Sequence, residues 1–289
     1  MSITARIMRW LLVISGFKFW LGLAFKYPPQ WLVNAWPAML PKGLATQWRE
    51  VKGRRIATLS PNEACGVHVV FLHGGGYALG FFPMFIRCVA GWVRDQGVRV
   101  SLLDYPLAPN AGVEDAQDFV REAYQCLLAE YPDERFCLVG DSAGGALALV
   151  QAQHLRDSGG PVPAKTVLIS PWVDADMARD FSPWADREVL LTTAALQVAI
   201  DNYRGDVPLH DPRISPLYGG LDNLGEVVIV AGSGELFFPD LCRLREQMMA
   251  SQGTSVLWFE GEGLWHDWVY FAIPEARQTR QDIGRWLVS

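Results

Sequence analysis

The chain has 289 residues, half of them apolar, and its 25 basic and 31 acidic side chains give a formal net charge of −6. This composition excludes a disordered chain, which would combine low hydrophobicity with high net charge. It also argues against a nucleic-acid partner, because no basic stripe is present to neutralise phosphates. The five cysteines are widely spaced without a CxxC pair, which predicts free thiols in a cytoplasmic protein. No cluster of Cys and His has zinc-ligand spacing, so we expect no metal site.

The N-terminal stretch from Trp10 to Phe25 is apolar nearly all round but carries Lys18 in its middle. A membrane-spanning helix needs about 20 apolar residues with few charges. The run then ends in Lys26-Tyr27-Pro28-Pro29, which does not resemble a signal-peptide cleavage site. We therefore expect a helix that packs over the protein's own pocket. Peripheral contact of this helix with a membrane is the first alternative, and true insertion or cleavage is the second.

From about residue 50 onward, short apolar runs alternate with longer helical patterns. Strands are predicted at 67–72, 98–103, 136–139, 166–169, 227–231 and 255–259. Helices are predicted at 83–95, 113–129, 143–156, 239–252 and 274–287. An antiparallel hairpin, formed by 48–51 and 55–59, leads into this series. The alternation predicts an α/β fold with a mostly parallel central sheet and helices on both faces.

Two segments do not follow the alternation: residues 1–47, and residues 173–213 with a helical pattern from Thr192 to Tyr203. We expect both to cap the carboxyl ends of the strands. The predicted organisation is therefore an N-terminal cap segment (1–47), a first part of the core (48–172), a cap insertion (173–213) and a second part of the core (214–289).

The segment Gly140-Asp141-Ser142-Ala143-Gly144 matches G-x-S-x-G and lies between a predicted strand and a predicted helix. Glycines in this pattern allow a sharp turn that exposes a serine hydroxyl above the sheet, with the helix N-terminus beneath it. This context predicts that Ser142 is a nucleophile. The alternative is an ordinary glycine-rich turn with a serine at the helix N-cap.

A second glycine-rich segment, His73-Gly74-Gly75-Gly76-Tyr77, follows the strand predicted at 67–72. Its backbone N–H groups point into space that no side chain fills, which suits the binding of an oxyanion. A phosphate-binding loop is the alternative, although no Lys-Ser/Thr pair follows. We expect His73 itself to orient the loop and not to act in catalysis.

A serine nucleophile needs a base, and His266 is the best placed of five histidines, since it lies in a loop just after the strand predicted at 255–259. The acid that orients the base should lie between serine and histidine in the chain. Glu235, four residues past the strand predicted at 227–231, is the first candidate and Asp240 the second. An aspartate in the first turn of a helix is explained by the helix dipole alone, which favours Glu235 as the acid.

Several motifs in order make the chain closely resemble the hormone-sensitive-lipase-like (GDXG) family of α/β-hydrolase carboxylesterases. They run from about residue 65 to 270 and are His73–Tyr77, Asp104-Tyr105-Pro106-Leu107-Ala108-Pro109, Gly140–Gly145, Asp211-Pro212-Arg213-Ile214-Ser215-Pro216 and the late His266. The resemblance implies an α/β-hydrolase fold with a helical cap and a Ser142–Glu235–His266 triad. It also implies that the N–H groups of Gly74, Gly75 and Ala143 form the oxyanion hole.

The chain departs from this family at two places. The family commonly has Asp where Glu235 stands, and Pro106 and Asn110 replace the more usual Arg and Glu of that loop. Asp104 and Asp211 are expected to be structural.

The expected function is a serine carboxylesterase that uses no cofactor and acts on small hydrophobic esters with short to medium acyl chains or a hydrophobic alcohol. The twelve tryptophans suggest an aromatic site, with Tyr77, Trp172 and Trp265 as substrate-binding candidates. An amidase or acyltransferase with the same triad, and a non-catalytic ligand-binding protein on a hydrolase frame, are the alternatives. A homodimer is left open, as is membrane association of the cytoplasmic protein.

Overall fold

The computed structural model describes residues 1–29 and 36–289, so residues 30–35 of the predicted N-terminal cap segment lie outside the described residues. Its centre is an eight-stranded sheet in the order β1-β2-β4-β3-β5-β6-β7-β8. The edge strand β1 pairs antiparallel with β2, β2 pairs antiparallel with β4, and the other pairs are parallel. The strands are β1 Ala45–Val51, β2 Arg54–Ser60, β3 Val67–Leu72, β4 Arg99–Leu103, β5 Arg135–Asp141, β6 Lys165–Ile169, β7 Gly225–Gly232 and β8 Thr254–Gly261.

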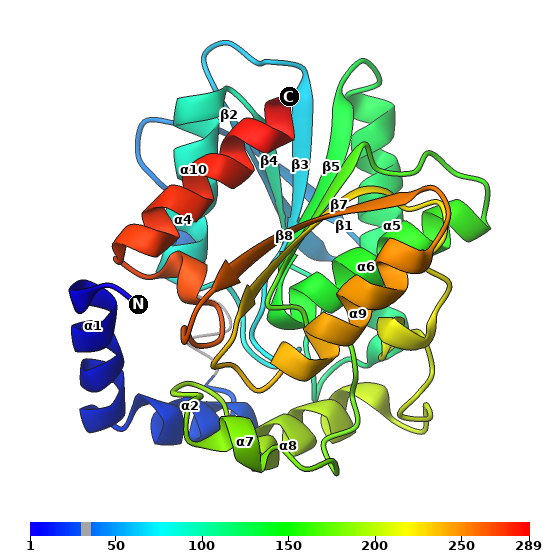
Figure 1. Ribbon diagram of the computed structural model, residues 1–289. Coiled ribbons are helices and arrows are strands. Elements are labelled where there is room, and N and C mark those ends of the chain that lie inside the picture. The colour runs from blue at the N-terminus through cyan, green and yellow to red at the C-terminus, as the bar shows by residue number, and fades with distance from the viewer. Residues whose placement is uncertain (30–35) are drawn as a thin grey trace.

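Helices cover both faces of this sheet (Figure 1). One face carries α4 (Pro83–Gln96) and α10 (Pro274–Val288), and the other carries α5 (Val113–Glu130), α6 (Ser142–Asp157) and α9 (Phe238–Ala250). Every residue of β3 and β6 is buried, as expected for strands covered on both sides. The predicted α/β-hydrolase architecture is therefore confirmed, including the entering hairpin, and the predicted elements agree with the observed ones to within a few residues.

Four further helices gather at the edge of the sheet where the parallel strands end (Figure 1). They are α1 (Ile3–Ile14), α2 (Phe17–Lys26), α7 (Ser182–Ala185) and α8 (Thr193–Arg204). Short 3-10 turns follow at η1 (Trp36–Met39), η2 (Pro216–Tyr218) and η3 (Trp268–Tyr270). The capping helices thus come from the two segments that break the strand–helix alternation.

The N-terminal segment forms two helices and not the single helix that the apolar run predicts. Ser15 caps the first helix, and Gly16, at φ +65°, begins the second in a left-handed conformation that glycine adopts without strain. The two helix axes differ by 57°. Within the described residues, no single helix is long and apolar enough to cross a membrane, whereas α1 and α2 together pass that test by length and composition alone.

The turn between β5 and α6 is the tightest junction of the core. A Cβ added at Gly144 would lie 2.1 Å from the carbonyl oxygen of Leu72, and one at Gly140 would lie 2.2 Å from the carbonyl oxygen of Gly144. Both neighbours are backbone atoms, which no side-chain rotation can move away. The two glycines therefore let α6 start directly against the end of β3.

We predict that Gly144→Ala destabilises the fold by about 3 kcal/mol or more, because overpacking against backbone forces the helix and strand apart. Gly91→Ala in α4 is the matched control, since nothing lies within 4 Å of a Cβ there. That change should stabilise the protein by about 0.5–1 kcal/mol through helix propensity. Urea unfolding of both variants measures the difference, and equal midpoints would contradict the tight-junction argument.

Candidate active site

The predicted nucleophile, acid and base all follow strands of the parallel part of the sheet. Ser142 comes directly after β5, Glu235 comes three residues after β7, and His266 comes five residues after β8. Parallel strands end at the same edge of a sheet, so their trailing loops meet there. The fold therefore brings three residues far apart in sequence to one edge.

Ser142 stands at the sharp turn that opens α6. Its backbone is left-handed, at φ +51°, which is a strained conformation for a residue with a side chain. Its carbonyl accepts a hydrogen bond from the N–H of Trp172 at 2.9 Å. Ser142 and His266 both line one apolar pocket, so the hydroxyl and the imidazole open onto the same space.

Glu235 makes the hydrogen bond that orients His266. Its Oε2 lies 2.8 Å from Nδ1 of the imidazole, and both side chains are buried. Its Oε1 accepts hydrogen bonds from the N–H of Gly232 at 2.7 Å and from the hydroxyl of Ser170 at 3.2 Å. A carboxylate held in this way keeps the proton of the imidazole on Nδ1 and leaves Nε2 as an acceptor.

The rival carboxylate, Asp240, is engaged elsewhere. It lies in the first turn of α9, and both of its oxygens bond the guanidinium of Arg179. A second arginine, Arg243, lies 3.5 Å from Oδ1. Asp240 therefore belongs to an ion-pair cluster under the cap, and the hydrogen bond to the imidazole comes from Glu235.

The predicted oxyanion loop requires one correction. The N–H of Gly74 donates to Oδ2 of Asp141 at 2.9 Å, so it does not point at the pocket. The next two glycines are left-handed, with φ of +112° at Gly75 and +58° at Gly76. Within the described part of the chain, no acceptor faces the N–H of Gly75, Gly76 or Ala143. The donors available to an oxyanion are thus Gly75, Gly76 and Ala143, with Gly76 in place of Gly74.

The three aromatic residues expected to bind substrate lie in the core behind the pocket. Tyr77 stacks face to face on Tyr203 of α8, with ring centroids 3.7 Å apart. Trp172 stacks on Phe237 and donates its indole N–H to the carbonyl of Asp174. Trp265 is fully buried. None of the three belongs to the pocket wall.

The pocket that holds Ser142 and His266 has a volume of about 190 Å³ and is almost entirely apolar. Its walls come from both ends of the chain and from the cap, and its lining side chains include Leu12, Phe17, Leu21, Phe25, Phe82, Met84, Phe85, Leu190, Leu191 and Phe271. The inner sides of α1 and α2 thus face the nucleophile, as the expectation of a helix over the pocket requires.

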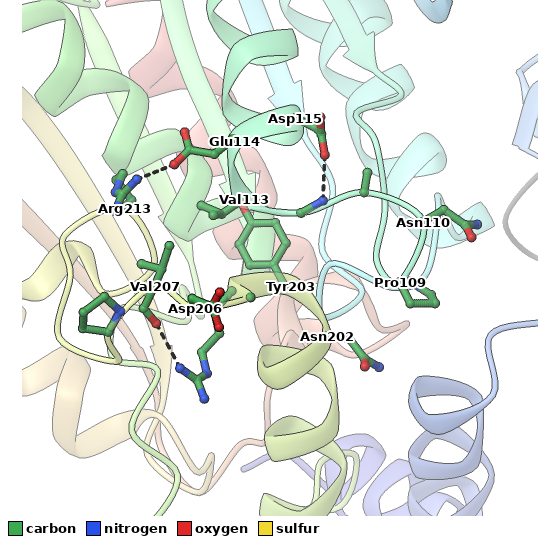
Figure 2. Close-up of a pocket in the computed structure, with 15 residues that line it drawn as sticks. Pro109, Asn110, Val113, Glu114, Asp115, Asn202, Tyr203, Asp206, Val207 and Arg213 are labelled. Carbon is green, nitrogen blue, oxygen red and sulfur yellow. Dashed lines mark hydrogen bonds and ion pairs between the residues drawn. The ribbon is translucent and has the colours of Figure 1, made fainter.

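A second, open cavity of about 550 Å³ lies between the loop at 109–115 and the end of α8 (Figure 2). Several of its charged groups bond the protein: Arg213 pairs with Glu114, Asp115 accepts from the N–H of Gly112, and Arg204 donates to the carbonyl of Val207. It contains none of the predicted catalytic residues. The reactive groups are therefore confined to the apolar pocket.

Two carboxylates that sequence reasoning missed also surround His266. Oδ2 of Asp267 lies 3.3 Å from Nε2 of the imidazole, and Oε2 of Glu188 accepts the backbone N–H of His266 at 3.2 Å. Burial alone lowers the pKa of His266, but the charge of Asp267 and the hydrogen bond to Glu235 outweigh it and raise that pKa to about 9. Burial raises the pKa of Asp267 to about 7.

Asp267 has a distinctive backbone, at φ +54°, which aims its side chain back at the imidazole. Its N–H donates to Oγ of Ser170, the hydroxyl that also bonds Glu235. Neither Asp267 nor Ser170 belongs to a sequence motif that would identify it as a functional residue. The signal for Asp267 was its position directly after the predicted base, and the signal for Ser170 was its position directly after a buried strand.

The three residues expected to be structural, His73, Asp104 and Asp211, form hydrogen bonds or ion pairs with neighbouring protein groups. Nδ1 of the buried His73 lies 2.7 Å from the carbonyl oxygen of Gly74, and burial lowers the pKa of His73 to about 4, so its ring is neutral. Asp104 forms an ion pair with Arg54, and Asp211 bonds Arg213 through both oxygens. Across residues 1–29 and 36–289, no group of three or more His, Cys, Asp or Glu could hold a metal ion.

Comparison with known proteins shows the family to which the chain belongs. The model of a family described as having an alpha/beta hydrolase fold matches residues 69–270. An acetyl-hydrolase from Streptomyces hygroscopicus is 35% identical over 232 residues, covering 78% of this chain and 77% of its own length. An esterase from Acinetobacter venetianus is 30% identical over 234 residues, with the same coverage of both chains. A crystal structure of a hormone-sensitive lipase from a metagenome library superposes with a TM-score of 0.84 at 27% identity, covering 99% of both chains.

We predict that the reaction of Ser142 with a fluorophosphonate accelerates with pH through a midpoint near 9. The imidazole must be neutral to accept the serine proton, and a raised pKa keeps it protonated below that midpoint. Asp267→Asn should move the midpoint to lower pH by roughly one unit or more, because it removes a neighbouring negative charge. Asparagine also tolerates the left-handed backbone. Asp282→Asn on α10 is the control and should leave the midpoint in place. An unmoved midpoint in Asp267→Asn would show that this carboxylate does not act on the base.

Proposed function

We propose that this chain, an ester hydrolase of the hormone-sensitive-lipase-like family of α/β-hydrolases, cleaves carboxylic esters through a covalent serine acyl-enzyme. The observation that carries the proposal is the buried hydrogen bond between Glu235 and Nδ1 of His266, beside a pocket that Ser142 and His266 both line. This arrangement supplies a nucleophile, a general base and a group that fixes the tautomer of the base.

In the first half-reaction, Oγ of Ser142 attacks the ester carbonyl while Nε2 of His266 takes the hydroxyl proton. The carbonyl oxygen becomes an oxyanion, and the N–H groups of Gly75, Gly76 and Ala143 are the donors available to it. Each such donor is worth about 3–4 kcal/mol of transition-state stabilisation. The tetrahedral intermediate collapses, the bond to the alcohol oxygen breaks, and the imidazolium returns its proton to the departing alcohol.

In the second half-reaction, water attacks the acyl-serine and His266 again accepts the proton. The acid is released when the bond between Oγ of Ser142 and the acyl carbon breaks. Asp267 enters both steps through its charge beside Nε2, since an ionised carboxylate there stabilises the imidazolium that forms in each transition state. The same charge holds the free base protonated below its raised pKa, so Asp267 favours activity at alkaline pH.

The pocket supports short to medium acyl chains or a hydrophobic alcohol as substrate groups. Its volume of about 190 Å³ is small, and aromatic and aliphatic side chains form its walls. Among the described residues, no Lys or Arg lines it to pair with a substrate carboxylate or phosphate. One relative carries the name acetyl-hydrolase, which agrees with a small acyl group. We therefore expect neutral, hydrophobic esters with few acyl carbons to react fastest.

We also propose that the protein works in the cytoplasm. All five cysteines are free thiols, and two of them, Cys88 and Cys137, are buried. Reduced cysteines are typical of a reducing compartment.

We predict that Ser142→Ala abolishes ester hydrolysis and covalent labelling by a fluorophosphonate while the protein remains folded. The hydroxyl opens onto a pocket, so its loss leaves no core cavity. Hydrolysis of a p-nitrophenyl ester series of increasing acyl length measures both the loss and the expected preference for short chains. Circular dichroism checks the fold. Turnover above a few per cent of wild type in this variant would refute the acyl-enzyme mechanism.

A second pair of variants tests the acid. Glu235→Gln keeps the size of the side chain but loses its charge, which favours the wrong tautomer and should lower kcat by up to roughly 10⁴, by analogy with the serine-protease triad. Asp240→Asn is the matched control, because that carboxylate bonds Arg179 and not the imidazole. It should lower thermal stability and leave kcat within a few-fold of wild type. The reverse pattern would assign the role to Asp240.

A further inference from the structure

The exposed apolar side chains of this protein are concentrated at one end of the chain. Among the described residues, seventeen large hydrophobic side chains are exposed, and twelve of them lie in residues 1–27. Ile3 is 77% exposed, Trp10 is 61% exposed and Trp20 is 62% exposed. Isolated exposed hydrophobic residues are normal, but a contiguous group of this size marks an interaction surface.

The two N-terminal helices are apolar on both sides. In α1, Ala5, Met8 and Leu12 form the inner stripe that packs on the protein, and the outer stripe opposite repeats every three or four residues. That outer stripe consists of Ile3, Ile7, Trp10 and Ile14. A surface helix of a globular protein carries polar residues at those positions.

The same pattern continues in α2. Its inner side contributes Phe17, Leu21 and Phe25 to the pocket, whereas Phe19, Trp20 and Leu23 are exposed on the other side. We call the outer stripe of α1, together with Phe19, Trp20 and Leu23, the outer apolar face.

The charged side chains of the N-terminal segment itself all have one sign, although Glu275 bonds Ser2 and Asp186 lies near Lys18. Residues 1–49 contain six Lys and Arg but no Asp or Glu, although the whole chain has a net charge of −6. Two of these cations hold the helices against the cap through hydrogen bonds. Lys18 donates to the carbonyls of Ala185 and Glu188. Arg9 donates to the carbonyl of Asp186. Arg6 and Lys26 are exposed beside the outer apolar face. The face is therefore hydrophobic with a cationic border.

We propose that the outer apolar face docks on the surface of a bilayer that contains anionic phospholipid, with α1 and α2 lying in the interface. Tryptophan and phenylalanine side chains would enter the boundary between headgroups and acyl chains, and Arg6 and Lys26 would meet lipid phosphates. The helices lie in the interface and do not cross the bilayer, because their axes differ by 57° and their inner sides line the protein's own pocket.

The positive border favours a lipid surface over a second copy of the chain. A symmetric dimer through this face would bring the same patch of both copies together, and with it Arg6 and Lys26 of each copy. Like charges at such an interface oppose association, whereas an anionic bilayer complements them. A cavity of about 300 Å³ between α2 and α8 adds further apolar space, and its lining includes Phe19, Leu23 and Val198 together with Lys18 and Lys26.

Docking in this orientation would place the catalytic pocket beside the lipid. The residues that line the pocket and those of the outer apolar face lie on the two sides of the same helices. A hydrophobic ester dissolved in the bilayer would then reach the pocket around α1 and α2 without crossing bulk water. The lipid surface itself is the partner in this proposal, and the docking stands whether or not the triad assignment holds.

The test is co-flotation of the full-length protein with vesicles of equimolar phosphatidylcholine and phosphatidylglycerol, compared with vesicles of phosphatidylcholine alone. Wild type should float with the anionic vesicles, and binding should weaken as salt is added. The double variant Trp10→Ser/Trp20→Ser should lose flotation. Trp48→Ser removes an exposed tryptophan of β1 outside the face and should float like wild type. Arg6→Gln/Lys26→Gln should weaken binding to anionic vesicles on the order of tenfold.

Folding and self-association are measured on the same samples. Hydrolysis of a soluble short-chain ester without vesicles should be equal in wild type and all three variants, since none of the substituted side chains lines the pocket. Wild type that stays at the bottom of the gradient would overturn the proposal. So would Trp48→Ser losing flotation as fully as Trp10→Ser/Trp20→Ser. Light scattering that finds a dimer in wild type and a monomer in Trp10→Ser/Trp20→Ser would assign the face to self-association instead.

Discussion

The close contact between the start of α6 and the end of β3 is the constraint on which the site depends. Gly144 allows the helix to begin against the carbonyls of Leu72 and His73, where any side chain would collide with backbone. Because the helix starts there, Ser142 is forced into a left-handed conformation above the sheet. The same contact brings Asp141 within hydrogen-bonding distance of the Gly74 N–H, so the oxyanion loop and the nucleophile are fixed relative to each other.

Carboxylates dominate the electrostatics around the base. Glu235, Asp267 and Glu188 all face His266, and all three are buried. A charged imidazole is ordinarily destabilised by burial, yet the pKa of His266 rises to about 9, so these charges outweigh the loss of water. Their mutual repulsion is reduced by partners: Glu188 bonds the N–H groups of Leu190 and Leu191, and burial raises its pKa. His266 is therefore stabilised in its protonated form, which is the form that each transition state of the proposed mechanism would generate.

Local patterns in the sequence were sufficient for the sheet, the sharp turn at Ser142 and the expectation that Glu235, and not Asp240, lies beside His266, because each rests on residues adjacent in the chain. The pocket walls were not predictable, since Phe25, Phe85 and Leu191 meet only after folding. Large aromatic side chains near a motif were a poor guide to the substrate site. They pack under the reactive loops as support, and smaller aliphatic and phenyl side chains from distant segments close the pocket. The direction of the Gly74 N–H could not be predicted either, because its acceptor, Asp141, lies 67 positions further along the chain.

The N-terminal helices line the pocket on their inner sides but expose apolar side chains to solvent on their outer sides. Their inner sides complete the pocket, so α1 and α2 must be held against the cap, and Arg9 and Lys18 hold them through backbone carbonyls of residues 185–188. No acidic residue precedes Glu50 in the chain, so the two helices contribute only cations of their own. An exposed hydrophobic face bordered by the exposed cations Arg6 and Lys26 is unfavourable in water and favourable at an anionic lipid surface. The two helices that line the pocket are therefore also the ones that we propose to dock on lipid.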